Sequence, residues 1–235
     1  MWFLPTHKRP EKLKRFLGTV AGADREENLM VILWKDDPRL HDYAGTFRHM
    51  PSNWDVWVQE ERLCGPKLQN AFRAFNTEKT YGFLADDTGL GTVGMLGELR
   101  REAEKGVLAW PNDGIHGPRM ATHPCASGDF LRKLGFWAHP QFPHNGFDTI
   151  LYYIAESIGV GKYRGDLNLI HWHPFKETAP GNGWNHAEWD QTYDDAREMN
   201  TKAIDAMYDF QERVLPGLVD RMRKEYRGQS QENRI

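Results

Sequence analysis

The sequence of 235 residues has little cysteine, no long hydrophobic run and no excess of charge of one sign. Its two cysteines, Cys64 and Cys125, are too few for a disulfide framework or a cysteine-rich zinc site, which indicates a reducing compartment. The longest apolar run, Leu29–Trp34, is far shorter than the roughly 18 residues that a membrane span needs. The first residues do not resemble an export signal either. We therefore expect a cytoplasmic protein without a membrane partner.

Charge is nearly balanced, with 30 basic and 33 acidic side chains, which excludes a global positive field that would attract nucleic acid. Basic residues still gather in the segments 7–15 and 221–227. Such runs are usually solvated helix faces, and a local binding patch is the alternative. A content of 40% hydrophobic residues supplies enough side chains for a buried core, so we expect a folded globular protein.

Strand-like runs alternate with helical periods, which is typical of an α/β fold with an open sheet flanked by helices. Short apolar runs predict strands at residues 2–4, 29–34, 55–58, 81–84, 107–110 and 167–172. Apolar spacing predicts helices that begin at Pro10 and Pro66 and helices over 92–105, 127–134 and 147–158. A long amphipathic helix over about 194–227, kinked at Pro216, follows. The chain is therefore predicted to be one domain over 1–193 with a helical arm, basic at its tail, over 194–235.

A glycine-rich segment offers one functional hypothesis. Residues 89–94, with sequence Gly-Leu-Gly-Thr-Val-Gly, have the spacing of a dinucleotide-binding loop, and Asp113 lies about where a ribose-binding acid would follow. The polar residues 85–88 separate this loop from its strand, and their two carboxylates would repel a pyrophosphate. We therefore expect a glycine-rich turn without a ligand, and a Rossmann-type NAD(P)-dependent oxidoreductase resting on Gly89, Gly91, Gly94 and Asp113 is the alternative functional hypothesis.

Carboxylates and imidazoles follow two predicted strands. Asp86 and Asp87 come directly after one strand, and His171 and His173 end another, with both rings on one face of it. The carboxyl ends of strands are where open α/β sheets bind ligands. A carboxylate and an imidazole from neighbouring strand ends can together hold Mn²⁺ or Mg²⁺. Taken alone, the aspartate pair is explained more simply as a solvated turn before a helix, and the histidine pair as a structural or surface pair.

In combination these segments resemble the GT-A glycosyltransferases, similar to family 2 and to small versions found in phage genomes. The resemblance covers about residues 2–195. It rests on the segments Phe3–Pro10, Phe83–Asp87, Phe147–Thr149, Ile170–Pro174 and Asp190–Tyr193. Ala85 stands where the family's D-x-D motif has its first aspartate, which leaves Asp87 as the expected metal ligand.

The resemblance implies an enzyme that transfers a hexose or pentose from a nucleotide sugar, most simply a UDP-sugar, to an acceptor hydroxyl. It implies a GT-A fold, a Mn²⁺ or Mg²⁺ ion held by Asp87 with His171 or His173, and Asp148 as the base of an inverting reaction. The donor is then expected to contact Pro5, Thr6, Lys8, Arg9, Asp36 or Asp37, Lys67 and Asp86.

The acceptor is the least defined part of this hypothesis. Aromatic residues surround the proposed site in the sequence and could stack on a sugar ring or a flipped base; they are Trp110, Trp137, Phe142, Phe147, Trp184 and Trp189. A hydroxymethylated base in phage DNA is one candidate acceptor, and a saccharide, a lipid-linked or a protein acceptor is equally compatible with the sequence.

Overall fold

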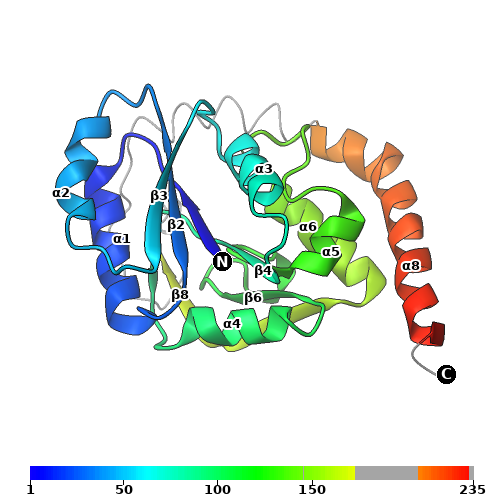
Figure 1. Ribbon diagram of the computed structural model, residues 1–235. Coiled ribbons are helices and arrows are strands. Elements are labelled where there is room, and N and C mark those ends of the chain that lie inside the picture. The colour runs from blue at the N-terminus through cyan, green and yellow to red at the C-terminus, as the bar shows by residue number, and fades with distance from the viewer. Residues whose placement is uncertain (145, 173–205, 233–235) are drawn as a thin grey trace.

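The computed structural model describes residues 1–144, 146–172 and 206–232, which form an α/β fold around an eight-stranded mixed sheet (Figure 1). The strands lie in the order β3-β2-β1-β4-β7-β6-β8-β5. They are β1 (Trp2–Pro5), β2 (Leu29–Trp34), β3 (Trp54–Gln59), β4 (Thr80–Phe83), β5 (Thr88–Leu90), β6 (Leu108–Asn112), β7 (Cys125–Ser127) and β8 (Gly161–His171). β1 pairs in parallel with β2 and β4, β2 pairs in parallel with β3, and β6 with β8. β7 runs antiparallel to β4 and β6, and β5 runs antiparallel to β8.

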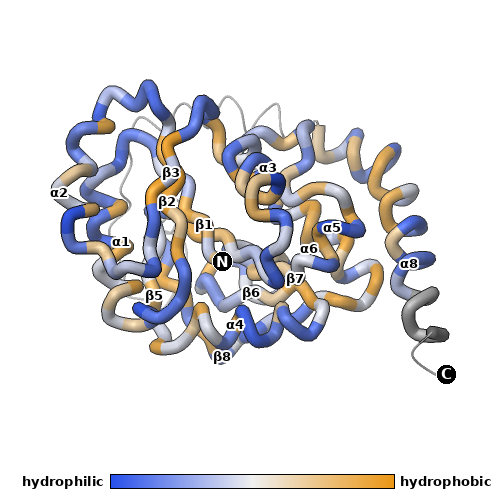
Figure 2. Tube along the Cα trace, viewed as in Figure 1, coloured by the Kyte–Doolittle hydropathy of each residue, from blue (hydrophilic) through white to orange (hydrophobic). Residues whose placement is uncertain are grey.

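Helices cover both faces of the sheet. They are α1 (Pro10–Ala23), α2 (Ala44–Phe47), α3 (Cys64–Ala74), α4 (Met95–Ala103), α5 (Gly128–Leu134), α6 (Phe147–Ile158) and α8 (Leu215–Glu232). Side chains that alternate along a strand enter different cores: Phe3 packs in the core beneath α3, α5 and α6, whereas Trp2 and Leu4 pack in the core beneath α1 and α4. Figure 2 shows apolar residues concentrated along β1, β2 and α6 and polar residues on the outer turns.

The ends of two predicted helices differ from the structure by two or three residues: α3 begins at Cys64 rather than at Pro66, and α4 spans Met95–Ala103 rather than 92–105. The short helix α2 was not predicted, and the larger differences lie along the second half of the sheet. β8 begins at Gly161 rather than at residue 167, and no sequence pattern indicated this start because residues 161–166 are exposed or half-buried and form no apolar run. β7 was not predicted, since it has only three residues and no apolar run marks it. The glycine-rich segment was expected to form a turn, but residues 88–90 form β5.

The C-terminal helix is interrupted at Val214, close to Pro216, where a kink was predicted. Residues 206–213 are helical, Val214 is a turn residue, and α8 starts at Leu215, directly before Pro216. Phe210 and Met222 of this arm have no exposed surface and pack into the core beneath α5 and α6. The predicted domain boundary at residues 193 and 194 lies outside the described residues. Within the described residues, no helix is both long enough and apolar enough to cross a membrane.

Candidate functional site

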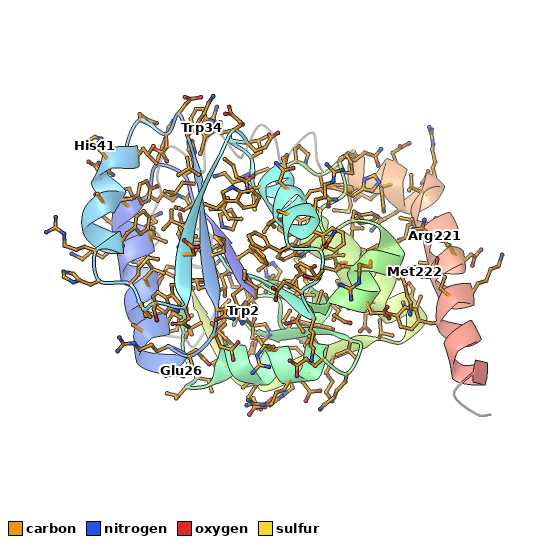
Figure 3. The ribbon with its side chains drawn as sticks, in the orientation of Figure 1. Trp2, Glu26, Trp34, His41, Arg221 and Met222 are labelled. Atoms are coloured by element: carbon orange, nitrogen blue, oxygen red, sulfur yellow. The ribbon has the colours of Figure 1, made fainter. Side chains whose placement is uncertain are left out.

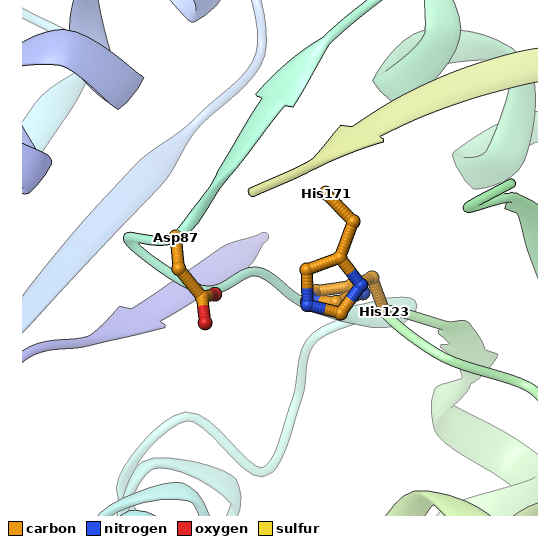
Figure 4. A group of neighbouring side chains, drawn as sticks. All are labelled: Asp87, His123 and His171. Atoms are coloured by element: carbon orange, nitrogen blue, oxygen red, sulfur yellow. The ribbon is translucent and has the colours of Figure 1, made fainter. Parts of the chain in front are cut away.

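Three side chains that can bind a metal converge where β5 and β8 meet. Asp87 lies in the turn before β5, His171 ends β8, and His123 lies in the loop before β7 (Figure 4). One ligand atom from each residue lies within 4.8 Å of the others, and all three side chains are buried. The backbone amide of Trp172 donates to the carbonyl oxygen of Asp87 over 2.8 Å, which fixes this turn beside the end of β8.

The donor set fits a divalent cation. Two ligand atoms on opposite sides of an ion at about 2.1 Å are about 4.2 Å apart, so only a small contraction of this group is needed. Burial lowers the pKa of His123 to about 3, which keeps its imidazole neutral, as a metal ligand must be. Its Nδ1 atom is buried and has no hydrogen-bond partner among the residues that the structure describes, an arrangement that binding an ion would satisfy.

His123 is the metal-ligand candidate that the sequence did not indicate, whereas Asp87 and His171 were both predicted. Its ring stacks on Phe83, with ring centroids 5.3 Å apart, and meets the His171 ring edge-on at 5.2 Å. His173, the other predicted ligand, lies outside the described residues. No motif surrounds His123, so only a signal for the short strand β7 behind it could have drawn attention to this residue.

The loop between β1 and α1 is fastened to Asp86 and Lys67. Asp86 accepts hydrogen bonds from Thr6 Oγ1 over 2.5 Å and from Arg9 Nη1 over 3.1 Å. Lys67 is 1% exposed, and its Nζ donates to the carbonyl oxygen of Thr6 over 2.8 Å. Burial lowers the pKa of this lysine to about 8. Both residues therefore shape the loop that begins at Pro5, and their predicted contact with a donor stays a prediction.

The two predicted nucleobase-binding acids have different surroundings. Asp36 is exposed, whereas Asp37 is 4% exposed and faces the same loop. Asp37 accepts the backbone N–H of Lys8 over 2.7 Å and that of Arg39 over 2.8 Å. Lys8 itself has the left-handed φ of 59°. Asp37 thus holds the turn that places Lys8 and Arg9 at the carboxyl end of β1.

The predicted base, Asp148, lies in the first turn of α6. Burial raises the pKa of its carboxyl group, while the backbone N–H of Thr149 and the positive charge of His116 act in the opposite direction. A carboxylate whose pKa is raised is a stronger proton acceptor than an exposed one, as general-base catalysis requires.

Cys64 and His144 also lie near these charged residues, although no sequence motif indicated either of them. Burial raises the pKa of the Cys64 thiol to about 12, and its surroundings include Lys67, Asp148, Asp86 and Asp87. Burial lowers the pKa of His144 to about 4, with Arg9 and Lys67 acting in the same direction. Charged groups from four separate segments, at residues 9, 67, 86–87 and 148, therefore share one region with Cys64 and His144.

The glycine-rich segment does not form a phosphate-binding loop. Three of its backbone N–H groups are already bonded within the protein: Leu90 to Thr19 Oγ1, Gly91 to the carbonyl oxygen of Asn168 and Gly94 to that of Ala23. Gly89 pairs with Ile170 in the β5–β8 ladder. Asp113 is fully buried and accepts three backbone N–H groups of the following turn, so it does not present a free carboxylate to a ribose.

The aromatic residues suggested for acceptor stacking belong to the core. Trp110, Trp137, Phe142 and Phe147 are each at most 3% exposed and pack beneath α3, α5 and α6. The prediction that these four stack on an acceptor was therefore wrong, because their position in the sequence carried no information about burial. Trp184 and Trp189 lie outside the described residues.

Comparison with known proteins identifies the fold. No family model and no curated protein matches the sequence. The S. aureus TarS fragment 1-349 in complex with UDP-GlcNAc superposes with a TM-score of 0.53 at 11% identity, over 71% of this chain and 57% of that one. This chain thus spans little more than half of that TarS fragment.

Two further structures have the same architecture. GalNAc-T7 with UDP, GalNAc and Mn²⁺ matches with a TM-score of 0.56 at 11% identity, over 72% of this chain and 43% of that one. The mannosyltransferase PcManGT from Pyrobaculum calidifontis, in complex with GDP-Man and Mn²⁺, matches with a TM-score of 0.53 at 13% identity, over 94% of this chain and 72% of that one. The chain therefore has the fold of the GT-A glycosyltransferases, as its sequence motifs predicted.

Proposed function

We propose that this protein is a metal-dependent glycosyltransferase that uses a nucleoside-diphosphate sugar, in first place a UDP-sugar. The observation that carries the proposal is the convergence of Asp87, His123 and His171 at the carboxyl ends of the strands, beside the loop held by Asp86 and Lys67. Three structures with this fold contain UDP-GlcNAc, GDP-Man or UDP, and two of these also contain Mn²⁺.

The proposed cation site favours Mn²⁺ over Mg²⁺. Asp87 supplies a carboxylate, while His123 and His171 supply imidazole nitrogen atoms. Mg²⁺ prefers oxygen ligands, whereas Mn²⁺ accepts imidazole as well as carboxylate. The bound ion would stabilise the negative charge that develops on the diphosphate leaving group. His173 is retained as an additional candidate ligand.

The loop between β1 and α1 is proposed to receive the nucleotide. Pro5 and Thr6 would line the base pocket through backbone groups, with Asp37 or the exposed Asp36 near the base. Lys8, Arg9 and Lys67 supply positive charge on the side where the diphosphate would lie, and Asp86 keeps Thr6 and Arg9 in place. This arrangement provides electrostatic stabilisation of the leaving group without large side-chain movement.

Asp148 is proposed as the general base of an inverting transfer. The acceptor hydroxyl oxygen would form a bond to the anomeric carbon as the bond from that carbon to the diphosphate oxygen breaks. The hydroxyl proton would pass to the Asp148 carboxylate, whose pKa burial raises. Both electrons of the broken bond leave with the nucleoside diphosphate.

The acceptor is proposed as a hydroxyl group on a saccharide or a protein, with a hydroxymethylated DNA base as a further candidate. For DNA, the basic segment 7–15 offers less than its composition indicated. Arg9 contacts Asp86, and the Arg15 guanidinium lies 3.7 Å from the ring centre of Trp172, so both side chains face the protein.

Donor turnover tests the proposal. The protein is incubated with UDP-glucose, UDP-GlcNAc or GDP-mannose and with Mn²⁺ or Mg²⁺, and nucleoside diphosphate release is measured with and without saccharide, protein and hydroxymethylated DNA acceptors. We expect release from one donor, faster with Mn²⁺. Asp148→Asn is expected to lower kcat by about 100-fold or more while donor binding persists. Failure to bind or turn over any of these donors would contradict the proposal.

A further inference from the structure

Asp113 is a fully buried carboxylate that the proposed reaction does not use. It follows β6 and is 0% exposed. Its Oδ1 atom accepts the backbone N–H groups of Ile115 over 3.0 Å, His116 over 2.8 Å and Gly117 over 3.3 Å. The Oδ1 atom therefore stabilises the turn after β6, whereas the Oδ2 atom of the same carboxylate faces side chains.

Two imidazole rings meet the Oδ2 atom of Asp113. His116 Nδ1 lies 2.8 Å from it, at hydrogen-bond distance, and His171 Nδ1 faces it at 3.6 Å, an electrostatic contact longer than a hydrogen bond. An ionised carboxylate only accepts hydrogen bonds, so each Nδ1 that faces it is stabilised in its protonated form. A neutral imidazole with hydrogen on Nδ1 has its free electron pair on Nε2. Asp113 therefore favours the His171 tautomer whose Nε2 can bind a cation.

We propose that Asp113 is a positioning residue that holds His171 in the Nδ1-protonated tautomer and turns its Nε2 toward the cation site formed with Asp87 and His123. The inference rests on the proposed function, because it concerns the same cation site. Asp113 acts only through His171 and does not touch the ion. Carboxylates that orient metal-binding histidines in this way raise metal affinity by about 10- to 100-fold.

The variant Asp113→Asn separates this role from the folding of the turn. Its side-chain oxygen can still accept the three backbone N–H groups that Oδ1 accepts. The amide nitrogen then replaces Oδ2 and donates a hydrogen bond, which favours the His171 tautomer with the free electron pair on Nδ1. The matched control is Asp24→Asn, because Asp24 is also a buried carboxylate that accepts two backbone N–H groups, those of Leu96 and Gly97.

Mn²⁺ binding without nucleotide, followed by the electron paramagnetic resonance signal of free Mn²⁺, is the first readout. We expect Asp113→Asn to weaken Mn²⁺ binding by about 10- to 100-fold while its melting temperature without metal stays close to that of Asp24→Asn. The Asp24→Asn protein should bind Mn²⁺ like the wild type. Unchanged Mn²⁺ affinity in folded Asp113→Asn would overturn the proposal.

A second readout needs no folded variant of Asp113. Nitrogen-15 NMR of the metal-free wild-type protein reports the tautomer of each histidine, and the His171 signals are assigned by their loss in His171→Gln. We expect hydrogen on Nδ1 of His171, and hydrogen on Nε2 would overturn the proposal even if Asp113→Asn does not fold. Wild-type protein that binds no Mn²⁺ but shows hydrogen on Nδ1 would contradict the proposed metal site and leave the effect of Asp113 on His171 supported.

Discussion

His123 combines a strained backbone with a buried imidazole. Its φ of 52° lies in the left-handed region, which costs a non-glycine residue about 1 kcal/mol or more. Its ring lies between Phe83 and His171 and is 5% exposed. Strain and burial of a polar ring both lower stability, so we expect function rather than stability to explain this residue.

The pH dependence of stability tests the environment of His123. Its pKa is lowered to about 3, so below pH 6.5 the unfolded chain binds a proton that the folded protein does not. The contribution of neutral His123 to the free energy of unfolding is therefore fully present above pH 6.5 and is lost as the pH falls below it. From pH 7.5 to 5 this one residue should lower the free energy of unfolding of the metal-free protein by about 2 kcal/mol. Urea denaturation at several pH values measures the free energy of unfolding. In His123→Gln, this free energy should fall less between pH 7.5 and 5 than in the wild type, by about the contribution of His123. An equal pH dependence in both proteins would contradict the account.

The N-terminus of α4 is capped by a residue that follows α1. Its N-cap is Gly94, with φ 76°, which has no side chain to accept the first N–H groups of the helix. Asp24, just after the last residue of α1, accepts the N–H of Leu96 over 3.2 Å and that of Gly97 over 3.3 Å. The cap is therefore supplied from a distant part of the sequence, and it joins the two helices that cover one face of the sheet.

Removing this cap should cost stability without affecting the site. We expect Asp24→Ala to lower the free energy of unfolding by about 1 to 2 kcal/mol, because two buried N–H groups lose their acceptor. Asp24→Asn keeps an oxygen acceptor and should cost less. Chemical denaturation of both variants measures the difference. A fully stable Asp24→Ala would show that α4 does not depend on this contact.

Elements with a strong apolar signal could be predicted from the sequence, and those that depend on their neighbours could not. The strand over 29–34 was predicted with its exact bounds because every residue of it is apolar. β5 was missed because its ladder with β8, including Gly89 opposite Ile170, comes from pairing between distant segments. The start of β8 was predicted six residues too late because its first half is polar and is held in register by β6.

In the whole molecule, the candidate site lies at one end of the sheet only. Figure 3 shows Trp34 at the end of β2 where the site lies and Glu26 at the opposite end. Met222 of α8 has no exposed surface, and the neighbouring Arg221 donates to the carbonyl oxygen of Leu134 in α5 over 2.8 Å. In its described part, the C-terminal arm thus shares the core of the domain.

Truncating Met222 tests whether the arm and the domain unfold together. We expect Met222→Ala to lower the free energy of unfolding by about 2 to 4 kcal/mol, because it leaves a cavity in a fully packed core. The loss should appear in one cooperative transition, measured by both circular dichroism and tryptophan fluorescence. Two separate transitions, or an unchanged main transition, would show that the arm unfolds independently.

About half of the candidate site could be predicted because its residues follow strands. Asp87 follows β4 by a few residues and His171 ends β8, and the carboxyl ends of strands that run in the same direction meet at one edge of a sheet. His123, Cys64 and His144 could not be predicted, since they reach this region from loops or a helix start whose course depends on the whole fold. Burial also could not be predicted, and four aromatic residues expected to bind an acceptor are core residues instead.

The central claim, a nucleotide site completed by a cation on Asp87, is tested most directly by thermal stabilisation. UDP, GDP, CMP, NAD and NADP are each added with and without Mn²⁺ to the wild type and to Asp87→Asn, because a ligand that binds only the folded state raises its melting temperature. The account predicts stabilisation by one nucleoside diphosphate that requires Mn²⁺ and is lost in Asp87→Asn. Stabilisation by NAD or NADP without metal, unchanged in Asp87→Asn, would contradict it.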